Sequence, residues 1–334
     1  MSREALIRRL PKVELHVHLE GTLEPGLAFE LGERNEVPLP FPSPEAMRAA
    51  YRFTDLRSFL DIYYASCSVL RTEQDFYDLT WAYLEHAHSD NVRHVEPFFD
   101  PQTHTSRGVD YADVVGGIRR ALADARTRFG MTSRLILCVL RDLTEHDAMT
   151  TLDEALRHGL IDGLGLDSGE VGNPPAKFAR VFAKARNARL HLVAHAGEEG
   201  PPSYIEEALD VLGAQRIDHG VRVLEDRALT VRLVHDGVCL TVCPSSNVSL
   251  QVADSMESHP LRRMLEAGLR VTVNSDDPAY FGGYLHDTYL HAAEALDLSD
   301  EQLITLARNA IDGSFASAAR KGELRAELEL ATRH

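Results

Sequence analysis

The stretch from Arg189 to Glu198 joins an apolar run to two residues that could do metal chemistry. The run is followed by His195, two small residues and Glu198. It predicts a buried strand, and the imidazole and carboxylate at its end suit a metal ligand and a proton carrier. On this interpretation the remaining histidine and aspartate clusters serve the same site. Those clusters hold His16 and His18, His219, and Asp276 and Asp277.

Residues 12–20 alternate strictly between apolar and polar side chains, and His16 and His18 are both on the polar side. Because successive side chains of a strand point to opposite faces, both histidines project the same way and can bind one metal ion. The alternative is a pair of polar residues on a solvated face. That alternative is weaker, because the other face is uniformly apolar and needs a core, so the histidines must point into a cavity.

The elements that must position these side chains alternate regularly. Short apolar runs predict further strands at 93–99, 134–140, 163–167, 189–195, 216–219, 239–243 and 270–274. Helical periodicity predicts the segments between them, at 111–129, 146–158, 175–187, 204–212, 226–235 and 260–267. Together with residues 12–20, the pattern predicts an α/β protein built as a closed (β/α)8 TIM barrel rather than an open sheet.

In such a barrel the chemistry lies where the strands end, at the carboxyl-terminal face. The polar residues predicted at those ends are His16, His18, His195, Glu198, His219, Asp276 and Asp277. Three histidines and a carboxylate suit a borderline metal such as zinc. One ion is the simpler arrangement, because the strand that ends at Asp167-Ser168 offers no lysine to bridge a second.

We expect a single domain over residues 1–334, with a helical insert at 24–90 after the first strand and extra helices after the eighth. Within the insert, one face of a predicted helix carries apolar side chains, namely Leu56, Phe59, Leu60 and Tyr63. This stripe suits a plain core contact, and a lid over a pocket is the alternative. The last helices include one opened by the capping box Ser299–Gln302.

The composition limits the partners. A formal charge of −16 argues against nucleic acid, whose binding depends on lysine and arginine displacing counterions. No stretch approaches the ~20 apolar residues of a membrane span, and the amino terminus lacks the apolar core of a signal peptide. We therefore expect a cytoplasmic protein with a small-molecule substrate and with neither a membrane nor a nucleic-acid partner. A homo-oligomer is compatible with the sequence.

Five motifs, in matching order over nearly the whole chain, resemble the adenosine and adenine deaminase family of the amidohydrolase superfamily. They are Pro11–Gly21, His195–Glu198, Arg216–Gly220, Cys243–Asn247 and Val273–Pro278. The chain is most similar to the adenine deaminase branch, because it has Glu20 where adenosine deaminases tend to carry Asp. The segments Phe98–Gln102 and Gly165–Pro175 agree with that branch. Gly169 and Ser245 depart from it, since serine and leucine are usual there.

The resemblance implies zinc-dependent hydrolysis of adenine to hypoxanthine and ammonia, in purine salvage. It implies one Zn²⁺ per subunit, with the ligands His16, His18, His195 and Asp276. Glu198 would be the acid that protonates N1 of the ring, which requires a raised pKa. His219 would accept or orient the proton of the attacking water, and Asp277 would hydrogen-bond the hydroxide or N7. Two residues are expected near the substrate: Gly169, and Glu20, whose extra methylene could fill the space that a ribose needs.

Two other functions stay open at this point. The same site could deaminate an N6-substituted adenine of the cytokinin type, or adenosine. A non-enzymatic barrel that senses a purine or a metal is a further alternative. The combination of Glu198, His219 and Asp277 argues against it, because a binding module does not need a proton donor beside a metal.

Overall fold

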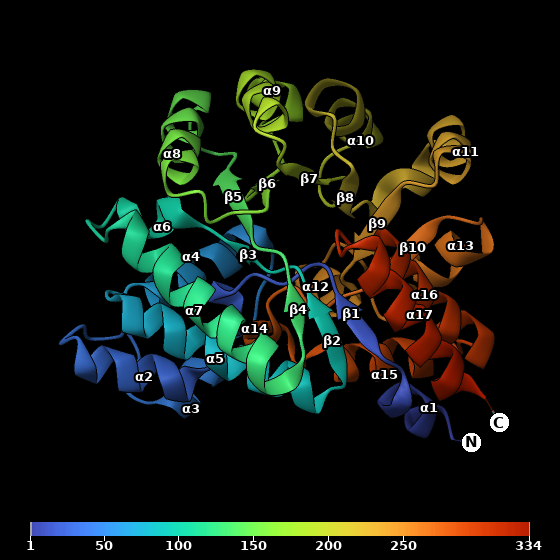
Figure 1. Ribbon diagram of the computed structural model, residues 1–334, viewed down its shortest axis with the longest axis horizontal. Helices are drawn as coiled ribbons and strands as arrows, with labels where there is room; N and C mark the ends of the chain where they lie inside the picture. Colours follow the sequence, from blue (N-terminus) through green and yellow to red (C-terminus); the bar gives the residue numbers. More distant parts are fainter. Residues whose placement is uncertain (1, 334) are drawn as a thin grey trace.

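The computed structural model describes residues 2–333, and a ring of parallel strands lies at its centre (Figure 1). The strands are β1 (Lys12–Glu14), β2 (Val92–Val95), β3 (Phe98–Phe99), β4 (Thr132–Ser133), β5 (Ile136–Leu140), β6 (Gly163–Asp167), β7 (His191–Ala196), β8 (Arg216–His219), β9 (Cys239–Val242) and β10 (Arg270–Val273). They pair in the orders β1-β2-β4 and β10-β9-β8-β7-β6-β5-β3. Every pair is parallel, as in a (β/α)8 barrel.

The segment that follows β1 closes the ring. Val17 forms a bridge to Asp276 beyond β10, and His18 forms one to Phe98 of β3. The His18 N–H donates to the Asp276 carbonyl at 3.0 Å, and the Phe98 N–H donates to the Val17 carbonyl at 2.8 Å. The residues that join the two sheets are therefore the same ones that carry histidine and aspartate into the barrel mouth. The predicted closed barrel is confirmed.

Seventeen α-helices surround or extend this ring within residues 2–333. They are α1 (Arg3–Arg9), α2 (Pro25–Arg34), α3 (Pro44–Ala49), α4 (Leu56–Cys67), α5 (Glu73–Ser89), α6 (Pro101–Thr105), α7 (Tyr111–Phe129), α8 (Glu145–His158), α9 (Ala179–Asn187), α10 (Pro202–Glu207), α11 (Arg227–Asp236), α12 (Pro244–Ser249), α13 (Leu261–Glu266), α14 (Pro278–Phe281), α15 (Leu285–Ala295), α16 (Asp300–Gly313) and α17 (Ala318–Thr332). Shorter turns are 3-10 helices η1 (Glu20–Thr22), η2 (Pro175–Phe178) and η4 (Val221–Glu225), and the π-helical η3 (Ala208–Leu212). The described helices include none long and apolar enough to cross a membrane.

Two predicted strands are shorter than the sequence suggested. The run 12–20 is a strand only over Lys12–Glu14, and Glu20 begins η1. The run 93–99 divides into β2 and β3 at Glu96-Pro97, because proline has no N–H for the strand ladder. The alternation of residues 12–20 therefore predicted the common direction of His16 and His18 correctly, although isolated bridges replace the continuous strand.

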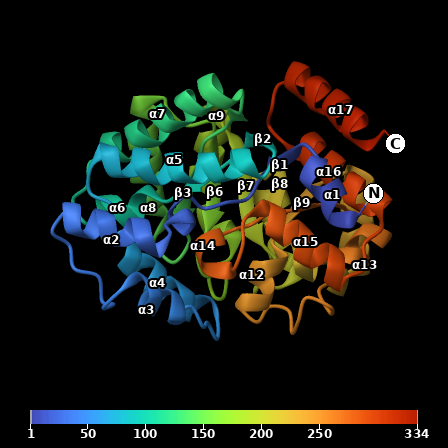
Figure 2. The ribbon, with the colours of Figure 1, turned by 90° about the horizontal axis from the view of Figure 1, so that it is seen from below.

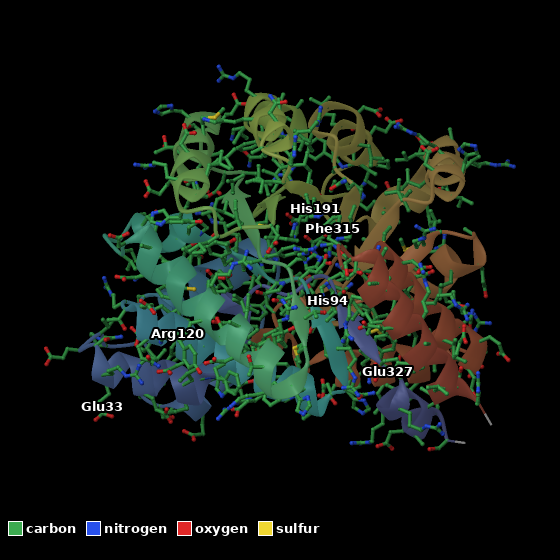
Figure 3. The ribbon with its side chains drawn as sticks, viewed as in Figure 1. Glu33, His94, Arg120, His191, Phe315 and Glu327 are labelled. Carbon is green, nitrogen blue, oxygen red and sulfur yellow. The ribbon has the colours of Figure 1, made fainter. Side chains whose placement is uncertain are left out.

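The two ends of the barrel differ. At the amino-terminal end, Phe315 stacks on His191 with ring centroids 4.0 Å apart (Figure 3). The buried Arg216 guanidinium lies over the same ring at 4.7 Å and pairs with Glu96. At the other end, α4, α12 and α14 lie on the same side of the strands (Figure 2). There Phe59 and Tyr63 of α4 pack with Tyr280 and Phe281 of α14. The access to the interior is therefore under the insert helix α4.

Candidate functional site

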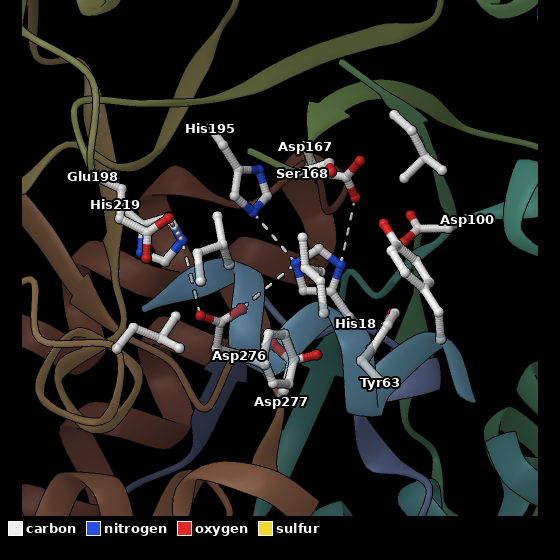
Figure 4. Close-up of a pocket in the computed structure, with 16 residues that line it drawn as sticks. His18, Tyr63, Asp100, Asp167, Ser168, His195, Glu198, His219, Asp276 and Asp277 are labelled. Carbon is white, nitrogen blue, oxygen red and sulfur yellow. Dashed lines mark hydrogen bonds and ion pairs between the residues drawn. The ribbon is translucent and has the colours of Figure 1, made fainter. Parts of the chain in front are cut away.

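A pocket lies at the carboxyl ends of the strands (Figure 4). Its polar residues are His18, Asp100, Asp167, Ser168, His195, Glu198, His219, Asp276 and Asp277. Its apolar residues include Leu56, Phe59 and Leu60 of α4, with Tyr63 and Tyr64 beside them. The apolar stripe predicted in the insert thus lines the pocket, and part of it also packs in an apolar cluster with α14, so its action as a lid stays a prediction.

Imidazoles from three strand ends surround the Asp276 carboxylate. His16 Nε2 lies 3.1 Å from Asp276 Oδ1, and His18 Nε2 lies 3.5 Å from the same oxygen. His18 Nε2 and His195 Nε2 are 3.3 Å apart, and His219 Nε2 is 3.8 Å from Asp276 Oδ2. The nitrogen or oxygen atoms of His16, His195, His219 and Asp276 that could bind a metal all lie within 4.8 Å of one another. Residues far apart in the chain therefore converge on one point.

The far sides of these imidazoles are held by Thr241 and Asp218. His16 Nδ1 is 2.9 Å from Thr241 Oγ1, whose hydroxyl donates to Asp218 Oδ1 at 2.8 Å. The other Asp218 oxygen lies 3.7 Å from His195 Nδ1. Asp218 is opposite His195 in the β7–β8 register, which explains its position. Partners of this kind fix ring orientation at metal sites.

The protonation states in this cluster suit a bound cation. Burial lowers the pKa of His18 to about 4 and that of His219 to about 3, and it lowers the pKa of His195 well below the ordinary value. These rings are therefore neutral at pH 7, as metal ligands must be. Burial opposes the charge on both His16 and Asp276, but their mutual attraction raises the pKa of His16 and holds the Asp276 pKa well below its ordinary value. His16 Nε2 is buried without a normal hydrogen-bond partner among residues 2–333, so the donor set fits a metal ion.

Glu198 has the opposite electrostatic environment. Burial and the nearby charge of Asp276 raise its pKa well above the ordinary value, which favours the protonated carboxyl. Asn247 Nδ2 lies 3.4 Å from Glu198 Oε1, and His219 Nε2 lies 3.5 Å from Glu198 Oε2. Burial and the Asp276 charge also raise the pKa of Asp277 well above its ordinary value. Two carboxyl groups with raised pKa values therefore lie beside a cluster whose donor atoms could hold a cation.

Glu20 and Gly169 lie next to the pocket without lining it. Glu20 is buried and accepts hydrogen bonds from the Asp100 N–H at 3.0 Å and from His104 Nε2 at 2.8 Å. Gly169 is half-buried and follows Ser168, which does line the pocket. The other predicted residues from His16 to Asp277 are brought together at the barrel mouth. Asp100 and Asn247 lie in segments that carry the family resemblance, but no role was expected for either of them, and Thr241 lies inside a predicted strand without any expected role.

The backbone is constrained at the same strand ends. Ser168, His219 and Asp276 have φ angles of 70°, 61° and 64°, which are left-handed values that non-glycine residues rarely adopt. Such conformations cost free energy and persist where the surrounding structure requires them. All three residues line the pocket, so the strained backbone conformations occur where side chains must point into the pocket.

Gly21 permits the close approach of η1 to Asp277. A Cβ at Gly21 would lie 2.6 Å from Asp277 Cγ and 2.7 Å from Asp277 Cβ, which no real structure tolerates. We expect Gly21→Ala to displace Asp277 and to lower kcat/KM by about 10- to 100-fold, because small misplacements of a reacting group are costly. Gly26→Ala is the matched control, since a Cβ there meets nothing within 4 Å. Steady-state kinetics with a metal assay checks this, and equal activity of the two variants would contradict it.

Comparison with known proteins agrees with this geometry. The family model described as adenosine deaminase matches residues 11–331. An adenine deaminase from Cupriavidus necator is 59% identical over 324 residues, which are 97% of this chain and 92% of the relative. The crystal structure of adenine deaminase from Arthrobacter aurescens is 53% identical with a TM-score of 0.95, and the match covers 96% of this chain and 98% of that one.

A more distant structure carries a metal. The crystal structure of an amidohydrolase from Burkholderia ambifaria with bound Zn is 28% identical with a TM-score of 0.90, and the match covers 99% of this chain and 94% of that one. The family model and the relatives match nearly the full length, so this chain belongs to the adenosine deaminase family.

Proposed function

We propose that the protein is an adenine deaminase, which hydrolyses adenine to hypoxanthine and ammonia. The observation that carries this proposal is the pocket-lining Glu198 carboxyl, whose pKa is raised by burial, beside the buried group of His16, His195, His219 and Asp276. An acid next to a group that activates water is what hydrolysis of an amidine carbon needs. The high identity to adenine deaminases supports adenine as the substrate.

The residues proposed to hold one Zn²⁺ are His16, His18, His195 and Asp276. Three imidazoles and a carboxylate are typical of a catalytic zinc site. Zinc in this position would supply water whose pKa is lowered from 15.7 toward ~7. The set follows the family resemblance, and His219 is assigned to proton transfer because its Nε2 lies 3.5 Å from Glu198 Oε2 as well as 3.8 Å from Asp276 Oδ2.

The chain's own residues then bind the base and move protons. Glu198 donates its proton to N1 of adenine, which makes C6 more electrophilic, and Asn247 orients the Glu198 carboxyl. His219 accepts the proton of the attacking water and returns it to the amino group on C6, which leaves as ammonia when the C6–N bond breaks. The remaining hydroxyl proton restores the Glu198 acid, and Asp277 hydrogen-bonds the attacking water or N7. Leu56, Phe59 and Leu60 of α4 cover the ring and exclude bulk water. One zinc ion per subunit, the cytoplasmic location and a homo-oligomeric state stay predictions.

A comparison of three substrates tests the proposal. We expect ammonia release from adenine with a kcat/KM at least ~10²-fold above the values for adenosine and N6-isopentenyladenine, because the relatives with high identity are adenine deaminases. Equal or higher turnover of adenosine or of the N6-substituted base would overturn the assignment. A zinc-loaded protein that releases no ammonia from any of the three would indicate the non-enzymatic alternative.

A further inference from the structure

Asp100 and Asp167 form a pair of buried acids on the pocket wall that the proposed mechanism does not use. Asp100 follows β3 and Asp167 ends β6, and they are 3% and 2% exposed. One oxygen of each and a His18 ring nitrogen lie within 4.8 Å of one another. Figure 4 shows Asp100 on the opposite side of the pocket from Glu198 and His219, with His18 between them. The pair therefore faces the end of the pocket that is remote from the proton donor.

The buried acids of this pair have oxygens that no protein group bonds. Asp100 Oδ1 and both Asp167 oxygens are buried without a hydrogen-bond partner among residues 2–333. His18 Nδ1 lies 3.6 Å from Asp167 Oδ2, so one side of Asp167 faces the imidazole. Asp100 lines the pocket, so its carboxylate is available to accept a hydrogen bond from a bound ligand.

The shape of adenine indicates what that oxygen meets. Glu198 protonates N1 in the proposed function, on which this inference rests. C4 is across the six-membered ring from N1, and C4 carries N9. The N9–H of a free base therefore points away from Glu198, toward Asp100. A nucleoside has no hydrogen on N9, and its ribose would meet the same wall.

We propose that Asp100, held in place by Asp167, accepts a hydrogen bond from the imidazole N–H of a free purine base and thereby selects free bases over N9-substituted purines. Asp167 acts as a positioning residue for both Asp100 and His18. The competing occupant of this corner is a second metal ion bound by His18, Asp100 and Asp167.

The test compares adenine with 9-methyladenine in the zinc-loaded wild type and in Asp100→Ala and Asp100→Asn. The wild type should prefer adenine by at least ~10³-fold in kcat/KM, since a site built for an N–H rejects the analogue that lacks it. Asp100→Ala should lower kcat/KM about 10²-fold for adenine and only slightly for 9-methyladenine, so most of the preference for adenine should be lost. Asp100→Asn keeps an acceptor oxygen and can donate to Asp167, so it should retain most of the preference. Asp142→Asn, which removes an exposed carboxylate beyond β5, is the matched control and should behave like the wild type.

Binding and metal content separate the outcomes. Calorimetry with purine and 9-methylpurine, which have no amino group to lose, should show the same Asp100-dependent preference. An Asp100→Ala protein that keeps the wild-type preference would overturn the inference, as would a second metal equivalent that this variant loses. Asp100-dependent binding of purine without ammonia release from adenine would remove the proposed reaction and leave the recognition in place. Deamination of adenine together with an unchanged preference in Asp100→Ala would keep the proposed reaction and remove the proposed recognition by Asp100.

Discussion

Glu198→Gln is expected to lower kcat on adenine by at least ~10²-fold while the metal content stays at the wild-type level. Glutamine has the shape of the protonated acid and can still hydrogen-bond N1, but it cannot transfer a proton, so the loss is that of a general acid. Asn247 and His219 keep their contacts to the side chain, so the pocket should remain intact. Steady-state kinetics with elemental analysis of the same preparation measures both quantities.

Glu199→Gln is the matched control for this experiment. Glu199 is the next residue, is only half-buried and does not line the pocket. The Glu199→Gln variant should keep kcat within about 3-fold of the wild-type value, because the substituted side chain lies outside the pocket. The pH profile adds a second readout: wild-type kcat should fall as pH rises through the raised pKa of Glu198, and Glu198→Gln should lose that limb. Wild-type turnover in Glu198→Gln would remove Glu198 from the mechanism.

The barrel and the strand-end residues could be predicted because both depend on local sequence patterns. Apolar runs of strand length between amphipathic helices imply a parallel sheet, and a parallel sheet puts all its carboxyl ends on one face. His16, His195, His219 and Asp276 follow from that rule without any knowledge of distances. The alternation at 12–20 predicted the direction of His16 and His18. Side chains two residues apart in an extended segment point the same way, even where only isolated bridges join it to its neighbours.

The remaining site residues depend on tertiary packing, which leaves no local signal. Asp100 and Asp167 are far apart in the sequence, and they form a pair only because the ends of β3 and β6 bring them to one buried corner of the pocket. The position of α4 was equally open, since an amphipathic helix packs its stripe against any apolar surface. Here the surface is α14, which directly follows Asp277, so the stripe also reaches the pocket. Thr241 and Asn247 contact other side chains of the site rather than the pocket itself, and such contacts cannot be predicted from the sequence.

His16→Ala is expected to remove the bound metal and to lower kcat/KM on adenine by at least ~10³-fold, because water in the pocket is then no longer activated. His16 is fully buried, its Nε2 faces Asp276 at 3.1 Å, and Thr241 fixes its other nitrogen. The loss of one of the four proposed ligands should therefore reduce zinc occupancy below about one tenth of the wild-type value. His219→Ala is the matched variant, since it removes a neighbouring imidazole that we leave out of the ligand set. It should keep zinc while losing turnover.

Zinc addition separates loss of the ligand from loss of the fold. Wild-type protein stripped with a chelator should regain thermal stability when zinc is added, because a ligand that binds only the folded state stabilises it. His16→Ala should have the circular dichroism spectrum of the stripped wild type and show no rise in Tm with zinc. Full zinc occupancy in His16→Ala would exclude His16 as a ligand. Loss of zinc in His219→Ala would instead assign the metal to the group of His16, His195, His219 and Asp276, whose atoms lie within 4.8 Å of one another, and His18 would then be the residue that faces the substrate.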